Sequence, residues 1–230
     1  MIAVAVSGRE RRWQVQQYGE WLVYAMPRRV TKKAKRSMVN DALLAGCRYY
    51  APSGQGRFFG ESPLQKLNDE EYRLLRLPDA AVAAAKRLAL PPARCPAQVI
   101  APTVNFCCEK TVIALSGYCR DVTLVSSDVL RAKRLAGLML RQYGLPLRLD
   151  ERPSLHAAGV ICSLQRSDSL IGGRAGEGRI YIAPDLYEVD FMPPFSCEMS
   201  PTTMAGMLYA ATRADWLRRL AVTRILPLDK

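Results

Sequence analysis

The sequence predicts an α/β fold in which helices and a mostly parallel sheet form three layers. Residues 98–150 read as strand, helix, strand, helix, strand, with short apolar runs that begin near residues 98, 122 and 145. These runs show no strict alternation of polar and apolar side chains, which is typical of strands covered on both faces. The segments between them are long enough for one helix each, and such crossovers are nearly always right-handed.

The first helix of this stretch is predicted to begin just after Pro102. Thr103 is the expected N-cap, because a threonine hydroxyl can accept a hydrogen bond from an N–H of the first turn. Apolar residues then recur at steps of three and four from Val104 to Tyr118, which is the period of a helix with one buried face. Gly117 is the expected end of the helix.

The second helix has clearer signals at both ends. Ser127 or Asp128 is the expected N-cap, and an apolar stripe runs from Val129 to Tyr143. Gly144 follows the last apolar position, where a left-handed residue is wanted, and Pro146 prevents the helix from continuing.

The part before residue 91 reads as a mixture of strands and helices. Residues 1–27 predict strands with a hairpin turn at Gly19, and residues 28–46 predict a helix whose first turns carry a basic outer face. A helical pattern over residues 69–90 is expected to end at Pro78 and to restart with Asp79 as its cap.

Three prolines within residues 91–96 mark a domain boundary or rigid connector. We therefore expect an N-terminal α+β portion at residues 1–90 and an α/β domain at residues 97–230. Strands at residues 159–164 and 179–183 are predicted to pair as a hairpin around the glycine-rich residues 172–178. Ser200 and Pro201 are expected to open a C-terminal helix that reaches about residue 222, with a methionine stripe in the core.

Composition limits the classes of protein to which the chain can belong. Hydrophobic residues make up 49% of 230 residues, which excludes global disorder, and no apolar run reaches the roughly 18–20 residues of a membrane span. Seven cysteines without a CxxC pair and a single histidine, His156, argue against a zinc site. Unpaired cysteines inside apolar patterns are typical of a reducing compartment, so we expect a cytoplasmic protein without a metal site.

The strand–helix pattern over residues 98–164 resembles part of a Rossmann-like domain. This resemblance implies a ligand site at the carboxyl ends of the strands, where helix N-termini offer unpaired N–H groups to an anion. The turn at residues 101–105 contains no glycine, which argues against a dinucleotide pyrophosphate there. We predict a small anionic or nucleotide-like ligand, with an unidentified cofactor if there is one. The predicted ligand-binding residues are Thr103, Asn105, Ser126, Ser127, Asp128 and Arg174.

The basic residues near the N-terminus suggest a different function. The net charge is +12, and most of the excess lies before residue 91, which favours a nucleic acid or another polyanion as partner. The simpler interpretation is the solvated face of a helix. The predicted polyanion-binding residues are Arg28, Arg29, Lys32, Lys33, Lys35 and Arg36.

A third hypothesis is an interaction or assembly protein that binds no ligand. The carboxylates are scattered and His156 is the sole imidazole, so the sequence defines no catalytic set. Whether the protein is an enzyme, and its oligomeric state, stay open at this point.

Overall fold

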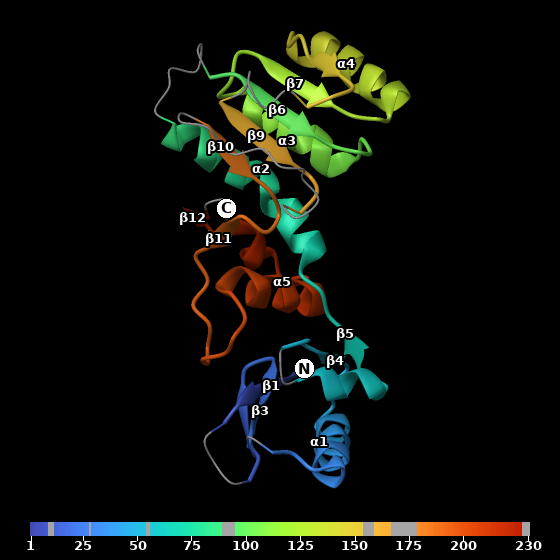
Figure 1. Cartoon of the computed structure of the whole chain (residues 1–230), viewed down its shortest axis with the longest axis vertical. Coiled ribbons are helices and arrows are strands. Elements are labelled where there is room, and N and C mark those ends of the chain that lie inside the picture. The colour runs from blue at the N-terminus through green and yellow to red at the C-terminus, as the bar shows by residue number, and fades with distance from the viewer. Residues whose placement is uncertain are drawn as a thin grey trace. The chain divides into compact units, whose positions relative to one another are not determined.

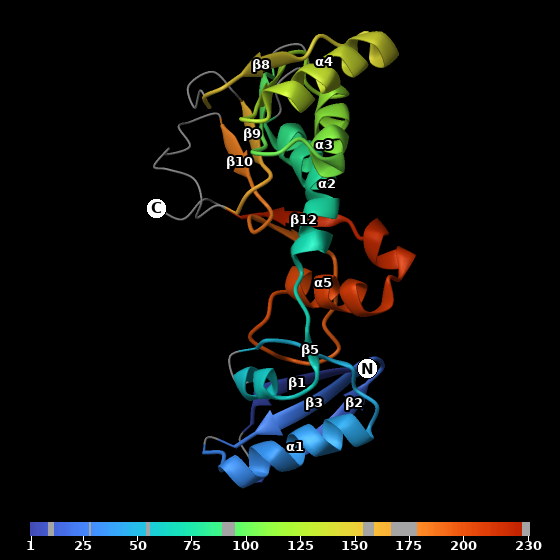
Figure 2. The same cartoon turned by 90° about the vertical axis from the view of Figure 1, so that its right-hand side faces the viewer.

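A computed structural model describes residues 1–8, 12–27, 29–53, 56–88, 95–153, 159–166 and 179–226. The chain forms two compact units (Figures 1 and 2). The first unit contains Met1–Tyr72 and Asp190–Leu220, and the second contains Arg73–Val189 and Ala221–Lys230. These units assign residues 190–220 to the first unit, whereas the sequence predicts domains at residues 1–90 and 97–230. The division into domains at residues 1–90 and 97–230 stays a prediction.

The first unit is built on a five-stranded sheet with the order β2-β3-β1-β4-β5. The strands are β1 (Ile2–Ser7), β2 (Gln14–Tyr18), β3 (Trp21–Met26), β4 (Tyr49–Tyr50) and β5 (Gln65–Lys66). Strands β2 and β3 pair antiparallel around Gly19, which has a φ of 56°, so the predicted hairpin is confirmed. The other neighbours pair parallel.

Alternate residues of β1 enter two different cores, because successive side chains of a strand point to opposite faces. Ala3 and Ala5 share a core with Met38 and Ala42 of α1 (Lys32–Leu44). Ile2 and Val4 share the other core with two methionines of α5 (Pro201–Thr212), Met204 and Met207. The predicted placement of the methionine stripe in the core is therefore confirmed.

The short 3₁₀ helix η1 (Gly56–Glu61) follows β4 and adds a fully buried ring to the α1 side of the sheet. Phe59 lies with its ring 5.9 Å from that of Tyr24 and 6.1 Å from that of Tyr50. Phe59 thus belongs to the buried core on the α1 side of the sheet.

The second unit carries a five-stranded parallel sheet with the order β10-β9-β6-β7-β8. The strands are β6 (Ala97–Ile100), β7 (Val122–Val125), β8 (Arg148–Asp150), β9 (Val160–Ser163) and β10 (Ile180–Ile182). Helix α3 (Phe106–Ser116) joins β6 to β7, and α4 (Val129–Tyr143) joins β7 to β8. Figure 2 shows both helices on the same side of the sheet.

The strand order identifies the fold of the second unit. Read from β8, the sheet contains the third, second, first, fourth and fifth of these strands, which is the order of a Rossmann-like sheet. Residues on β6 and β9 are buried throughout, as strands covered on both faces must be. The predicted Rossmann-like α/β fold is confirmed.

Helix α2 (Glu70–Arg87) differs from the prediction, because it passes through Pro78 without a break. Proline lacks the N–H that would bond to the carbonyl of Leu74, so the helix loses one internal hydrogen bond. Strong helix formers flank the proline on both sides, and Arg76 pairs with Asp79 at 2.6 Å. Asp79 is thus a residue inside the helix and not the predicted cap.

The predicted hairpin between the fourth and fifth strands is wrong. Val160 pairs with Ile180 and Cys162 with Ile182 in parallel register, and a two-strand hairpin can join only antiparallel strands. The glycine-rich residues 172–178 lie outside the described part of the chain. Glycine content signalled a turn, but it carried no information on the direction of the next strand.

The C-terminal helix is shorter than predicted. Helix α5 begins at Pro201 with Ser200 as its cap, as expected, but it ends at Thr212 because Arg213 adopts a left-handed conformation with φ 55°. A 3₁₀ helix, η4 (Asp215–Arg219), and β12 (Val222–Ile225) follow. Strand β12 pairs antiparallel with β11 (Tyr187–Val189) in the second unit.

Within the described residues, none of the helices combines the length and the apolar character needed to cross a bilayer.

Candidate functional site

The candidate site lies at the carboxyl edge of the parallel sheet in the second unit. Strand β6 is the centre of this sheet, with β7 on one side and β9 on the other. The chain adds β7 and β8 in one direction and then returns to the other side of β6 to add β9. In open α/β sheets, ligands bind at the carboxyl ends of the strands next to such a reversal. The reversal here lies between β6 and β9.

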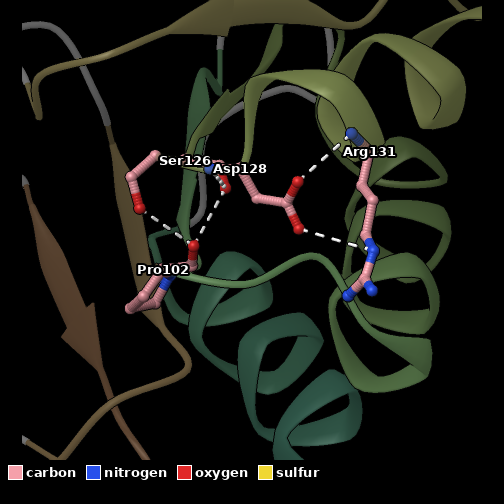
Figure 3. Close-up of polar contacts among 5 residues, drawn as sticks. Pro102, Ser126, Asp128 and Arg131 are labelled. Atoms are coloured by element: carbon pink, nitrogen blue, oxygen red, sulfur yellow. Dashed lines mark hydrogen bonds and ion pairs between the residues drawn. The ribbon is translucent and has the colours of Figure 1, made fainter.

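The loops that follow β6 and β7 are tied together by two serine hydroxyls. The Oγ of Ser127 donates to the carbonyl oxygen of Pro102 at 3.0 Å, and the Oγ of Ser126 lies 3.5 Å from the same oxygen (Figure 3). Ser126 is buried, whereas Ser127 is exposed. The structure thus brings these two predicted residues to one point at the edge of the sheet.

Asn105 and not Thr103 caps helix α3. The Oδ1 of Asn105 accepts a hydrogen bond from the backbone N–H of Cys108 at 3.0 Å, and the helix begins at Phe106. Thr103 is exposed and lies three residues before the helix. The predicted cap was therefore wrong by two positions, because both residue types favour caps and the sequence alone does not choose between them.

Asp128 caps helix α4, as predicted. Its Oδ1 accepts from the backbone N–H of Arg131 at 3.3 Å, and its Oδ2 lies 3.6 Å from the Nε of the same arginine (Figure 3). The Asp128 N–H donates to Ser126 Oγ at 3.1 Å. With its carboxylate engaged in this way, Asp128 serves the helix terminus.

The remaining predicted residues are distributed over other parts of the chain. Arg174 lies outside the described residues, as does His156. Of the alternative polyanion set, Arg28 also lies outside them. Arg29 precedes α1, and Lys32, Lys33, Lys35 and Arg36 occupy its first turns with exposed side chains. The two predicted sets thus belong to different units of the chain.

Residues at the end of β9 were missed from the sequence. Ser163 is fully buried, and its Oγ accepts from the Gln165 N–H at 3.0 Å. Arg166 follows with an exposed side chain. Residues 151–159 are too few for a crossover helix, which signalled that the chain does not simply extend the sheet beyond β8. That signal excludes β9 as a parallel neighbour of β8, and its place beside β6 comes from the structure.

Two buried cysteines near this edge, Cys108 and Cys162, have raised pKa values. Burial raises the pKa of Cys108 to about 12, with smaller contributions from Cys107 and Glu109. Burial also raises the pKa of Cys162 on β9. Since the thiolate is the nucleophilic form, neither residue is suited to covalent catalysis. Among the residues the structure describes, no group of three or more His, Cys, Asp and Glu side chains could hold a metal ion.

Comparisons with known proteins give only distant likenesses. No family model matches the chain, and no curated protein matches it in sequence. Quinate dehydrogenase from Corynebacterium glutamicum in complex with NAD is 11% identical, with a TM-score of 0.29 over 70% of this chain and 69% of that one. L-tryptophan dehydrogenase from Nostoc punctiforme is 9% identical, with a TM-score of 0.34 over 78% and 68%.

A shikimate 5-dehydrogenase-like protein is 13% identical, with a TM-score of 0.29 over 95% of this chain and 94% of that one. All three TM-scores lie below 0.5, so none of these likenesses carries an argument about function. The strand order of the second unit is the basis for its Rossmann-like assignment.

Proposed function

We propose that the second unit binds a small anionic or nucleotide-like ligand at the carboxyl edge of its sheet, between β6 and β9. The observation that carries this proposal is the strand order, which places the reversal beside β6. The proposal concerns binding and attaches no reaction to it. A cytoplasmic location stays a prediction that rests on the seven free cysteines.

Two helix termini support an anionic ligand. The N-termini of α3 and α4 follow the carboxyl ends of β6 and β7, and the first N–H groups of any helix have no partner within it. The helix dipole adds a partial positive charge at the same place. Asn105 and Asp128 each satisfy one of these groups, at Cys108 and Arg131, so other first-turn groups supply the donors.

Arg166 supplies the nearest side-chain charge in sequence to the end of β9. It is exposed and follows that strand by three residues, on the side of β6 where the reversal lies. A guanidinium can hold a phosphate through two parallel hydrogen bonds. We therefore add Arg166 to the predicted residues Thr103, Ser126 and Ser127.

The ligand is expected to carry a terminal phosphate and not a dinucleotide pyrophosphate. Close approach of backbone to pyrophosphate normally requires glycine in the first turn, and this turn contains Pro102 and Thr103 instead. Cβ atoms and the proline ring would hold a bridging pyrophosphate away from the N–H groups. A mononucleotide can approach the helix termini from the open side.

The experiment compares ADP with adenosine, which shares the base and sugar but lacks the phosphates. ADP in about 100-fold excess over its Kd should raise the free energy of unfolding by about 2.7 kcal/mol. For a chain of this size that is a shift in Tm of several degrees, at about 2–4 °C per kcal/mol. Adenosine should give little shift, and the ADP shift should shrink with added salt.

Arg166→Ala should weaken ADP binding about tenfold or more, in line with one charge-assisted contact. Arg120→Ala is the matched control, because Arg120 is also exposed but precedes β7 at the opposite edge of the sheet. Equal ADP affinity in both variants would remove Arg166 from the site. If none of the three compounds ADP, AMP and inorganic phosphate raises the Tm, the whole proposal is rejected.

A second candidate function is polyanion binding by the first unit. Its supporting observation is that Lys32, Lys33, Lys35 and Arg36 are all exposed on α1, whose first turn has no acidic residue. Binding of single-stranded or duplex nucleic acid should then fall steeply with salt. The triple variant K32E/K33E/K35E should abolish it, and R131E/K133E/R134E on α4 is the control. If the control loses as much affinity, the binding is non-specific attraction to net charge.

Failure of both tests would favour the third hypothesis, an interaction or assembly protein without a ligand.

A further inference from the structure

The first unit contains a cavity of about 270 Å³ at the carboxyl edge of its own sheet. Its walls are residues 5–7 at the end of β1, Ser53 shortly after β4, and residues 196–198 in the segment before α5. All of these residues belong to the first unit. The cavity is far larger than the roughly 10–15 Å³ that one water needs, and slightly below the range of about 300–1000 Å³ for drug-sized ligands.

The fold gives this cavity the position of a ligand site. Strands β3, β1 and β4 run parallel, with β3 and β4 on opposite sides of β1. The carboxyl end of β1 is therefore a second place in this chain where the order of parallel strands reverses. Neither the serines nor the acidic residue of this cavity were singled out from the sequence.

The chemistry of the cavity wall is rich in hydrogen-bond acceptors. The hydroxyl of the buried Ser53 donates to the carbonyl of Ala5, so its proton is used and its oxygen remains an acceptor. Glu198 brings a carboxylate with an exposed side chain, and Ser7 and Ser196 bring exposed hydroxyls. Among the residues that the structure describes, none of those in the cavity wall is cationic.

The thiol of Cys197 in the same wall acts as a weakly polar surface. Its Sγ lies 3.4 Å from the Sδ of Met204 and 3.9 Å from the carbonyl oxygen of Met199. Burial raises the pKa of Cys197, while the hydrogen bond to Met199 lowers it in part. The thiol is turned toward α5 and stays protonated, so the cavity is suited to binding and not to nucleophilic attack.

We propose that this cavity binds a small organic molecule through a primary ammonium group held by Glu198. An ammonium has three donors and no acceptor, which matches a wall of carboxylate and hydroxyl oxygens. A hydrogen bond between charged partners is roughly twice as strong as one between neutral groups. The rest of the ligand lies against the half-buried Val6 and Cys197.

Ethanolamine and ethylene glycol are the probes, because they have equal numbers of heavy atoms and differ in one ammonium for one hydroxyl. Titration of the full-length, ¹⁵N-labelled chain with ethanolamine should shift the amide signals of Ser7, Ser53 and Cys197 and reach saturation. Ethylene glycol should bind at least about tenfold more weakly, since it lacks the charge-assisted contact.

Glu198→Gln keeps the size of the side chain and removes its charge. It should reduce ethanolamine binding to the level of ethylene glycol, while the control E188Q, in β11 of the second unit, should leave it unchanged. Ser196→Phe, which fills the cavity from an exposed position, should abolish the binding of both ethanolamine and ethylene glycol. Equal binding of the two probes, ethanolamine binding that survives E198Q, or no saturable shift at Ser7 and Ser53 would each overturn the proposal.

Discussion

The Oγ of Ser127 lies 3.0 Å from the carbonyl oxygen of Pro102, and this hydrogen bond joins the loops that follow β6 and β7. Its neighbour Ser126 makes a longer contact to the same oxygen but also accepts the Asp128 N–H, and it is buried. The two adjacent serines thus share one acceptor and differ in burial.

Removal of these hydroxyls should have unequal costs. Ser126→Ala leaves the part-buried Asp128 N–H without its partner, so it should lower the free energy of unfolding by about 1–3 kcal/mol. Ser127→Ala exposes its acceptor to water and should cost less than about 1 kcal/mol. Urea denaturation of both variants measures the difference. Equal costs would mean that Ser126 Oγ is not the partner of Asp128.

The start of α3 can be tested by removing each of the two possible caps. Asn105→Ala should lower the free energy of unfolding by about 0.5–2 kcal/mol, because the Cys108 N–H loses its acceptor. Thr103→Ala, at an exposed position outside the helix, should change it by less than about 0.5 kcal/mol. A larger effect at Thr103 than at Asn105 would restore the cap predicted from the sequence.

Gly137 within α4 and Gly144, which caps its end, should respond in opposite directions to the same substitution. Gly144 has a φ of 65°, where an added Cβ meets no atom within 4 Å but the backbone is strained. Gly144→Ala should therefore cost about 1–2 kcal/mol. Gly137 lies inside the helix, with its nearest contact 3.7 Å away on Arg141, so Gly137→Ala should stabilise by about 0.5–1 kcal/mol. Thermal unfolding of both variants gives the two signs.

Alkaline pH should destabilise the second unit through Cys108. Its folded pKa of about 12 lies above the value of about 8.5 expected in the unfolded chain. Between these values the unfolded state loses the thiol proton and the folded state keeps it, so stability falls as pH rises. The expected contribution is about 1.4 kcal/mol per pH unit from roughly pH 9 upward.

Cys108→Ala removes this contribution, so its stability should fall less steeply than that of the natural chain between pH 8 and 10. Urea unfolding at several pH values measures both slopes. Identical slopes would show that the thiol is ionised to the same extent in the folded and unfolded states.

Local signals in the sequence determined the elements that were predicted well. Helix α4 has a capping aspartate, an apolar stripe and a left-handed glycine at its end, and all three lie within its own segment. The loop that contains Ser126 and Asp128 could be predicted because it directly precedes the start of that helix. The position of these residues at the sheet edge then followed from the parallel strands.

Features that depend on distant contacts were missed. The pairing of β10 with β9 and the continuation of α2 through Pro78 are determined by tertiary packing and not by the residues alone. The cavity beside β1 brings Ser7, Ser53 and Glu198 together from three separate segments. No local pattern marks any of them, because a serine after a strand is also the ordinary start of a loop.

The discontinuous first unit has a consequence for the order of events on the ribosome. Ile2, Val4 and Trp21 form an apolar sheet face whose cover includes Met204 and Met207, and these are synthesised about 180–205 residues later. A nascent chain that has reached only residue 189 exposes that face to water. Exposed apolar surface makes an incomplete chain prone to aggregate, and this face is covered only once α5 has emerged.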